Sequence, residues 1–115
     1  SDADSNALSG IPGGPGVYEG PVRVLKTEKD VATIQPGEVL VAAITAPSWA
    51  AAFSVAAAVV TDIGGMMSHA SIVCREYGIP AVVGTGFATA RLKTGQHVRV
   101  DGDTGVVTIL EEEAQ

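Results

Sequence analysis

Short apolar blocks, separated by turn residues, organise the chain. Residues 38–43, 57–61 and 79–83 are almost continuously apolar, which is typical of buried strands. Residues 17–25 also favour a strand, with a bulge or break expected at Gly20-Pro21. Two alternating segments within residues 96–110 flank Gly102-Asp103-Thr104 and predict a β-hairpin.

Two short helices are predicted between these strands. One lies within residues 45–52 and starts near Ser48, directly after Pro47. The other covers about residues 66–77 and ends at Gly78. Residues 11–16 are rich in proline and glycine, so we expect a loop there that is neither a helix nor a central strand. The order of these elements predicts a single α/β domain with a mixed sheet and short helices.

The length of 115 residues suits one compact domain. We expect residues 1–10 to be a linker or a disordered N-terminus, residues 11–112 to form the domain, and residues 113–115 to be a tail.

Charge and cysteine content argue against several classes of function. The formal net charge is −6 and no basic cluster is present, which argues against nucleic-acid binding and against docking on acidic lipids. The single cysteine, Cys74, cannot form an internal disulfide, and no Cys/His spacing resembles a zinc site. No apolar stretch is long enough to span a bilayer, and the N-terminus lacks a signal-peptide pattern. These features predict a cytoplasmic protein without a metal site.

Candidate chemistry concentrates in residues 61–69, where a buried strand, two glycines and a helix follow one another. Gly64 and Gly65 allow close approach to the backbone, and His69 falls in the first helical turn. The unpaired amides and the positive dipole at the start of a helix favour an anion. The pKa of a free imidazole is about 6.5, so its neutral, nucleophilic form is abundant at neutral pH. An imidazole in this position can therefore act as a nucleophile toward phosphorus.

The pattern by itself is not specific. No lysine follows the glycines, so this is not the phosphate-binding loop G-x-x-x-x-G-K-[ST], and it does not match G-x-G-x-x-G either. A lone histidine in a first turn is also often a surface or capping residue. The short motif leaves both interpretations of His69 open.

A longer resemblance favours the catalytic interpretation. The segment TDIGGMMSHASIVCREYGIPAVVGTG, residues 61–86, resembles the phosphohistidine segment of the phosphoenolpyruvate (PEP)-utilising enzymes. These include PEP synthase, pyruvate phosphate dikinase, enzyme I of the sugar phosphotransferase system and rifampin phosphotransferase. Pro15-Gly16, Pro47-Ser48-Trp49 and the closing VDGDTGVV also resemble the mobile domain of this family. The resemblance covers about residues 11–110.

The resemblance implies a swivelling β/β/α domain in which His69 accepts a phosphoryl group at one active site and delivers it at another. It also implies two partners, an ATP-grasp-like nucleotide-binding domain and a PEP/pyruvate or other acceptor domain, in the same chain or as subunits. ATP or PEP and Mg are expected on those partners, and no cofactor is expected on this domain. Such a phosphotransferase domain is not expected to turn over alone. The alternative is a non-catalytic docking or regulatory module that keeps the swivelling fold.

Two positions depart from several of these relatives. Arg often stands where this chain has Met66, and Thr where it has Met67. The apolar pair is closer to the rifampin phosphotransferase and PEP synthase-like branch, so the phosphoryl acceptor stays open. The two methionines could form a docking patch or pack locally as adaptable filler.

Thr61, Gly64, Gly65 and Ser68 are the candidates for supporting the phosphoryl group. Ser68 either contacts that group or caps the helix. Thr61 and Asp62 either orient His69 or only end the strand.

Simpler roles are predicted for several other residues. Arg75 is assigned to a structural ion pair, because it lies on a different side of the helix from His69. His97 is assigned to an exposed strand position and Trp49 to the core. Tyr77 shares a helical spacing with core positions and is assigned to the core as well.

Overall fold

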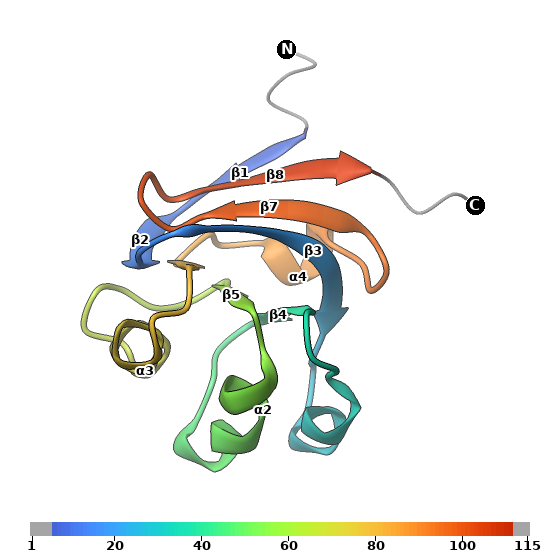
Figure 1. Ribbon diagram of the computed structural model, residues 1–115, viewed down its shortest axis with the longest axis vertical. Helices are drawn as coiled ribbons and strands as arrows, with labels where there is room; N and C mark the ends of the chain where they lie inside the picture. The colour runs from blue at the N-terminus through green and yellow to red at the C-terminus, as the bar shows by residue number, and fades with distance from the viewer. Residues whose placement is uncertain (1–5, 112–115) are drawn as a thin grey trace.

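A computed structural model describes residues 6–111, and for residue 111 it describes the backbone alone. It shows an eight-stranded mixed sheet with short helices (Figure 1). The elements in chain order are β1 Ala7–Ser9, β2 Ile11–Gly14, β3 Val17–Val24, the 3₁₀ helix η1 Glu28–Thr33, β4 Val39–Ala42, the 3₁₀ helix η2 Pro47–Trp49, α2 Ala50–Val55, β5 Ala58–Thr61, α3 His69–Tyr77, β6 Ala81–Val83, α4 Ala88–Arg91, β7 His97–Asp101 and β8 Val106–Glu111.

The sheet has a parallel half and an antiparallel half that share β3. Its strand order is β1-β8-β7-β3-β4-β5-β6-β2, in which β3, β4, β5 and β6 are parallel to one another. The strands at the two ends of this order, β1 and β2, are consecutive in the chain and are joined by Gly10. One stretch of backbone therefore supplies both edge strands, and because these strands are short, they expose few unpaired backbone groups.

Two hydrophobic cores lie on opposite faces of the parallel half. On one face, alternate residues such as Leu40 and Val59 pack with Phe53 of α2 and Ala70 of α3. On the other face, the intervening residues pack with β7, β8 and α4, as Val60 does. Because successive side chains of a strand point to opposite faces, a strand buried on both sides is apolar at every position. The β/β/α arrangement expected from the sequence is confirmed.

The prediction for residues 1–10 was wrong where the structure describes them. Residues 1–5 lie outside the described part, but Ala7–Ser9 is strand β1 and pairs with β8. Leu8 is only 2% exposed and belongs to the second core. A buried leucine and a strand partner far along the chain order a segment whose composition resembles a linker.

The loop predicted at residues 11–16 is partly a strand. Ile11–Gly14 forms β2, which pairs with β6 at the end of the sheet, a position that tolerates proline. A Cβ atom on Gly13 would lie 2.8 Å from the hydroxyl of Ser71, and one on Gly14 would meet the carbonyl oxygen of Ile79. These glycines serve close packing of β2 against its neighbours.

The other strand predictions are confirmed to within two residues at each end, and the C-terminal hairpin is formed by β7 and β8. No bulge occurs at Gly20-Pro21, because both residues stay in register with β7. The helix expected within residues 45–52 is instead η2 followed by α2, which extends to Val55. Besides β1 and β2, two helical elements were not predicted, η1 and the single-turn helix α4.

Among residues 6–111, none of the helices combines the length and the apolar character that crossing a membrane would need.

Candidate phosphoryl-accepting site

The candidate site lies where the parallel strands β4, β5 and β6 end. The loops that follow these strands cover residues 43–46, 62–68 and 84–87. Backbone hydrogen bonds tie them together: the amide of Ile63 donates to the carbonyl of Ala43, and the amide of Gly86 donates to that of Asp62, both at 2.9 Å. In sheets with parallel strands, ligands usually bind outside these carboxyl ends.

Helix α3 begins at this edge, with Ser68 as its N-cap and His69 as its first residue. The predicted start at Met66 was three residues too early, because residues 65–68 form a turn closed by a bond from the Ser68 amide to the Gly65 carbonyl. The Ser68 hydroxyl accepts the amide of Ser71 at 3.3 Å. The capping role of Ser68 is thus confirmed, and the first amides of α3 have no partner inside the helix.

The imidazole of His69 is half-buried and held from two sides. Its Nδ1 lies 3.0 Å from the hydroxyl oxygen of Thr45, which follows β4. The ring of Phe53, from α2, lies edge-on to the imidazole, with 5.5 Å between ring centroids and an interplanar angle of 81°. Both neighbours are buried. With Nδ1 occupied by Thr45, Nε2 is the ring nitrogen without a recorded protein partner in the described part of the chain.

The two glycines before α3 have different roles. Gly64 has a φ of +136°, a conformation that side chains disfavour, and an added Cβ would lie 3.0 Å from the Ser68 hydroxyl. An added Cβ on Gly65 would meet nothing within 4 Å. The Gly65 carbonyl accepts hydrogen bonds from the hydroxyls of Ser68 and Ser71, each at 2.7 Å. The hydroxyls of Ser68 and Ser71 therefore fix the turn, and the space that a Cβ on Gly65 would occupy is open.

Comparison with known proteins identifies the family. The family model described as the PEP-utilising enzyme mobile domain matches residues 34–105, more than half of the chain. This chain is a PEP-utilising enzyme mobile domain. The resemblance noted in the sequence is confirmed.

Curated relatives of this mobile domain include phosphotransferases. The chain is 52% identical over 101 residues to phosphoenolpyruvate synthase of Aeropyrum pernix, a match that covers 87% of the chain and 12% of the relative. It is 42% identical over 106 residues to rifampicin phosphotransferase of Bacillus cereus, which covers 92% of the chain and 12% of the relative. The chain spans only 3% and 13% of the first two curated relatives that it matches. In each of these relatives the matching segment is a small part of a much longer protein.

A solved structure supports the same assignment. The mobile domain matches the solution structure of an Enzyme I protein with a TM-score of 0.61 and 35% identity, over 72% of this chain and 34% of that one. The α/β fold class predicted from the sequence is confirmed by this neighbour and by the mixed sheet.

The structure places Thr61 and Asp62 beside the turn without a recorded contact to His69. The Thr61 hydroxyl donates to the carbonyl of Ile63 at 2.9 Å. The carboxylate of Asp62 accepts the amide of Thr89 at 2.9 Å and its hydroxyl at 2.5 Å. These residues hold the β5–α3 loop against its neighbours, and the residue that hydrogen-bonds the imidazole is Thr45.

Sequence reasoning missed both residues that hold the imidazole. Thr45 carried one usable signal, since it is a polar residue shortly after an apolar strand, and Thr61 is a polar residue at the end of another. Phe53 carried none, because an aromatic residue in a short helix is ordinarily only part of the core.

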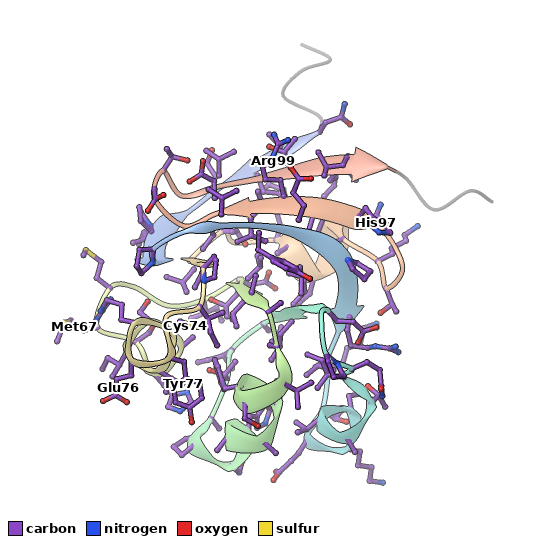
Figure 2. The ribbon with its side chains drawn as sticks, viewed as in Figure 1. Met67, Cys74, Glu76, Tyr77, His97 and Arg99 are labelled. Carbon is purple, nitrogen blue, oxygen red and sulfur yellow. The ribbon has the colours of Figure 1, made fainter. Side chains whose placement is uncertain are left out.

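Two of the four residues assigned to simpler roles behave as predicted. Trp49 is buried and His97 is exposed on β7, on the opposite side of the view from Met67 (Figure 2). Arg75 donates to the carbonyl of Gly13 at 3.4 Å, rather than forming the expected ion pair. Tyr77 is 52% exposed, so its assignment to the core was wrong. It is the last residue of α3, and Cys74 is the last residue of this helix that is buried.

The remaining ionisable groups of the mobile domain show no metal site. Within the described range, no three His, Cys, Asp or Glu side chains gather closely enough to hold a metal ion. Cys74 is buried on the inner side of α3, and this burial raises the pKa of its thiol to about 12. A thiol so hard to ionise is a poor nucleophile.

Proposed function

We propose that this mobile domain is a phosphoryl carrier, in which Nε2 of His69 accepts a phosphoryl group at one active site and delivers it at another. The observation that carries the proposal is the 3.0 Å contact between Nδ1 of His69 and the hydroxyl of Thr45. This contact occupies one ring nitrogen and turns the other away from its partner. An oriented imidazole beside an open glycine turn is suited to nucleophilic attack.

The chemistry of the step follows from this orientation. The lone pair of Nε2 attacks phosphorus, and the bond between phosphorus and the leaving oxygen breaks with its electron pair going to that oxygen. The ring becomes positively charged as the nitrogen–phosphorus bond forms, and the proton stays on Nδ1. The Nδ1–H group then donates to the hydroxyl oxygen of Thr45, a hydrogen bond that strengthens as the ring gains charge. Delivery of the phosphoryl group reverses these changes.

The surroundings of His69 support a bound phosphoryl group in part. The first amides of α3 have no partner inside the helix and favour an anion. Gly65 leaves open space beside the turn, and Gly64 and Ser68 hold the shape of the turn. The Thr61 hydroxyl supports the same loop by donating to the carbonyl of Ile63. These are the support roles that we propose for the four residues.

Most of the charge neutralisation must come from elsewhere. The loops at residues 43–46, 62–68 and 84–87 contain no lysine or arginine. Phosphoryl transfer depends mainly on positioning and on neutralising charge, which cations and Mg commonly provide. We therefore assign ATP or PEP and Mg to an ATP-grasp-like nucleotide-binding partner and to a PEP/pyruvate or other acceptor domain, in the same chain or as subunits. The carrier alone, residues 7–111, should not turn over.

The named relatives suggest the branch of the family, the one that contains rifampin phosphotransferase and the PEP synthase-like proteins. Both a phosphoenolpyruvate synthase and a rifampicin phosphotransferase are more than 40% identical to the chain, and the apolar pair Met66-Met67 favours this branch. We propose that the acceptor is a small molecule, as the names of these two relatives suggest for their own reactions, and that the enzyme is cytoplasmic with access to ATP.

A chimeric enzyme tests the carrier role. The 106 residues of Bacillus cereus rifampicin phosphotransferase that align with this chain are replaced by the chain, and the chimera is incubated with Mg and ATP labelled in each phosphoryl position. Label should enter the domain through a bond that is labile in acid and survives alkali. His69→Ala should abolish the labelling, whereas His97→Ala, which removes the domain's other histidine, should label normally.

Two results would count against the carrier. Label that persists in His69→Ala would place the phosphoryl group on another residue, and an acid-stable label at Ser68 would do the same. In either case the glycine turn would be a structural junction, and a docking or regulatory module would be the better description.

A further inference from the structure

Exposed apolar side chains gather at the end of the sheet that carries the candidate site. Half of the large apolar residues that are exposed in the described chain lie in the loops after β4, β5 and β6. We call these residues the collar: Ile44 (59% exposed), Ile63 (59%), Met66 (60%), Met67 (80%) and Phe87 (50%).

The three loops that carry the collar are joined to one another by backbone hydrogen bonds. The amide of Ile63 bonds to the residue before Ile44, and the loop of Phe87 bonds to the loop of Ile63 through Gly86 and Asp62. Ile44 directly precedes Thr45, which contacts His69, and Met67 lies two residues before His69. Met67 stands at the outer edge of the molecule beyond α3 (Figure 2). The half-buried imidazole thus lies at the same end of the sheet as apolar side chains from three loops.

Nothing in the fold requires these side chains to be apolar. They belong to neither hydrophobic core, and they are exposed at the end of the sheet where the candidate nucleophile lies. Contiguous exposed apolar groups of this kind commonly mark an interaction surface. The most exposed members are methionines, whose flexible side chains adapt to the surface that they meet.

The charge around the collar indicates the chemistry of the partner. The only charged residue in these loops is Asp62, whose carboxylate is already bonded to Thr89. A phosphoryl group on His69 would therefore stand in an apolar surround without a cation from these loops. A complementary partner must supply apolar contacts at its rim and positive charge at its centre.

We propose that the collar docks this domain on the phosphoryl-donor domain, through a partner surface whose apolar rim encloses a cationic phosphate-binding pocket. This inference rests on the carrier function proposed above. It adds that the contact is made by apolar side chains from all three loops, and that their removal slows transfer without changing the chemistry at His69.

Two matched double variants test the collar. Ile63→Ser with Met67→Ser removes apolar area next to His69 without adding charge. Val17→Ser with Leu110→Ser does the same at positions 52% and 41% exposed, on β3 and β8, outside the collar. Each pair is placed in the Bacillus cereus chimera, and the initial rate of labelling from ATP is measured. Loss of interface anchors should slow the collar variant about tenfold or more, while the control should stay within about twofold of the unmodified chimera.

A small-molecule donor separates the collar from the carrier function. The full chain, outside the chimera, is treated with phosphoramidate, which needs no docking, and phosphorylation of His69 is followed by NMR. Both double variants should react within about twofold of the unmodified chain. If His69 of the unmodified chain does not react, the carrier proposal fails.

The other outcomes concern the collar. Equal labelling of the collar and control variants by the chimera would overturn the docking proposal while leaving the carrier intact. A chimera with the unmodified chain that takes no label from ATP, although phosphoramidate labels His69, would contradict the proposed fit between collar and donor domain. A collar variant slowed equally with both donors would assign these side chains to the geometry of His69, and not to docking.

Discussion

Thr45→Val is the substitution that most directly probes how His69 is held. Valine keeps the shape of threonine but removes the hydroxyl that lies 3.0 Å from Nδ1. Thr45 is only 8% exposed, so water replaces the lost hydroxyl poorly. Thr45→Ser is the matched control, because it retains a hydroxyl at the same position and loses only a methyl group.

The expected effects differ between the resting protein and the reaction. A neutral hydrogen bond contributes about 0.5–1.5 kcal/mol to stability, so the thermal unfolding midpoint of Thr45→Val should be a few degrees lower. As phosphorus bonds to Nε2, the ring becomes cationic and the bond from Nδ1–H to Thr45 is worth about 1.5–3 kcal/mol. Because the variant also loses the resting bond, only the difference of about 1–1.5 kcal/mol should slow phosphorylation of His69, by about fivefold to tenfold. The released ring should also react partly at Nδ1.

The assay uses the chain with His97→Ala, so that every phosphohistidine signal comes from His69. Phosphorylation by phosphoramidate is followed by ³¹P NMR, and the reacting nitrogen is assigned by ¹⁵N NMR. Thr45→Ser should restore most of the rate and attachment at Nε2. If Thr45→Val reacts at the normal rate and only at Nε2, the hydroxyl does not position the imidazole and the reasoning from this contact is refuted.

Three further predictions concern stability and reactivity. Thermal unfolding should show that Gly64→Ala loses about 1 kcal/mol or more, because its φ is +136°, whereas Gly65→Ala changes little; equal losses would contradict the distinct roles of the glycines. The pKa of the Cys74 thiol is raised from 9.0 to about 12, so its contribution to stability is present below pH 9 and is lost as the pH rises toward 12. Denaturant unfolding should then show that Cys74→Ala loses less stability than the unmodified chain over that pH range. An equal loss of unfolding free energy in both chains would argue against burial of the thiol. Hydrogen bonds from Arg23 lower the pKa of Glu38 below 4.5, so Glu38→Gln should cost about 1 kcal/mol or less at pH 7 and nothing once acid has protonated the native carboxylate; a cost that persists in acid would assign it to packing.

Periodicity predicted most of the strands for a clear physical reason. The strands β4, β5 and β6 are buried on both faces, so they appear in the sequence as short apolar runs. The glycine turn and Gly78 gave the end of α3 and placed His69 in its first turn. The segments that escaped prediction, β1 and β2, depend on partners more than 60 residues away in the chain, which local composition does not encode.

The candidate site was predictable only along one segment of the chain. Residues 61–69 contain the nucleophile, its cap and its glycine turn, so a local motif reveals them. The contacts that orient the imidazole come from Thr45 and Phe53, which lie 24 and 16 residues before His69 and reach it only through the pairing of β4 with β5. The collar shares this property, since it gathers side chains from three separate loops.

The central claim is that His69 carries the phosphoryl group on Nε2 while Thr45 holds Nδ1. The most direct measurement is ¹⁵N and ³¹P NMR of the domain after the chimera has been phosphorylated by ATP, with the histidine nitrogens isotopically labelled. We predict a phosphorus–nitrogen coupling to Nε2 of His69 and a protonated Nδ1. Attachment at Nδ1, or a phosphoryl group on any residue other than His69, would contradict the account.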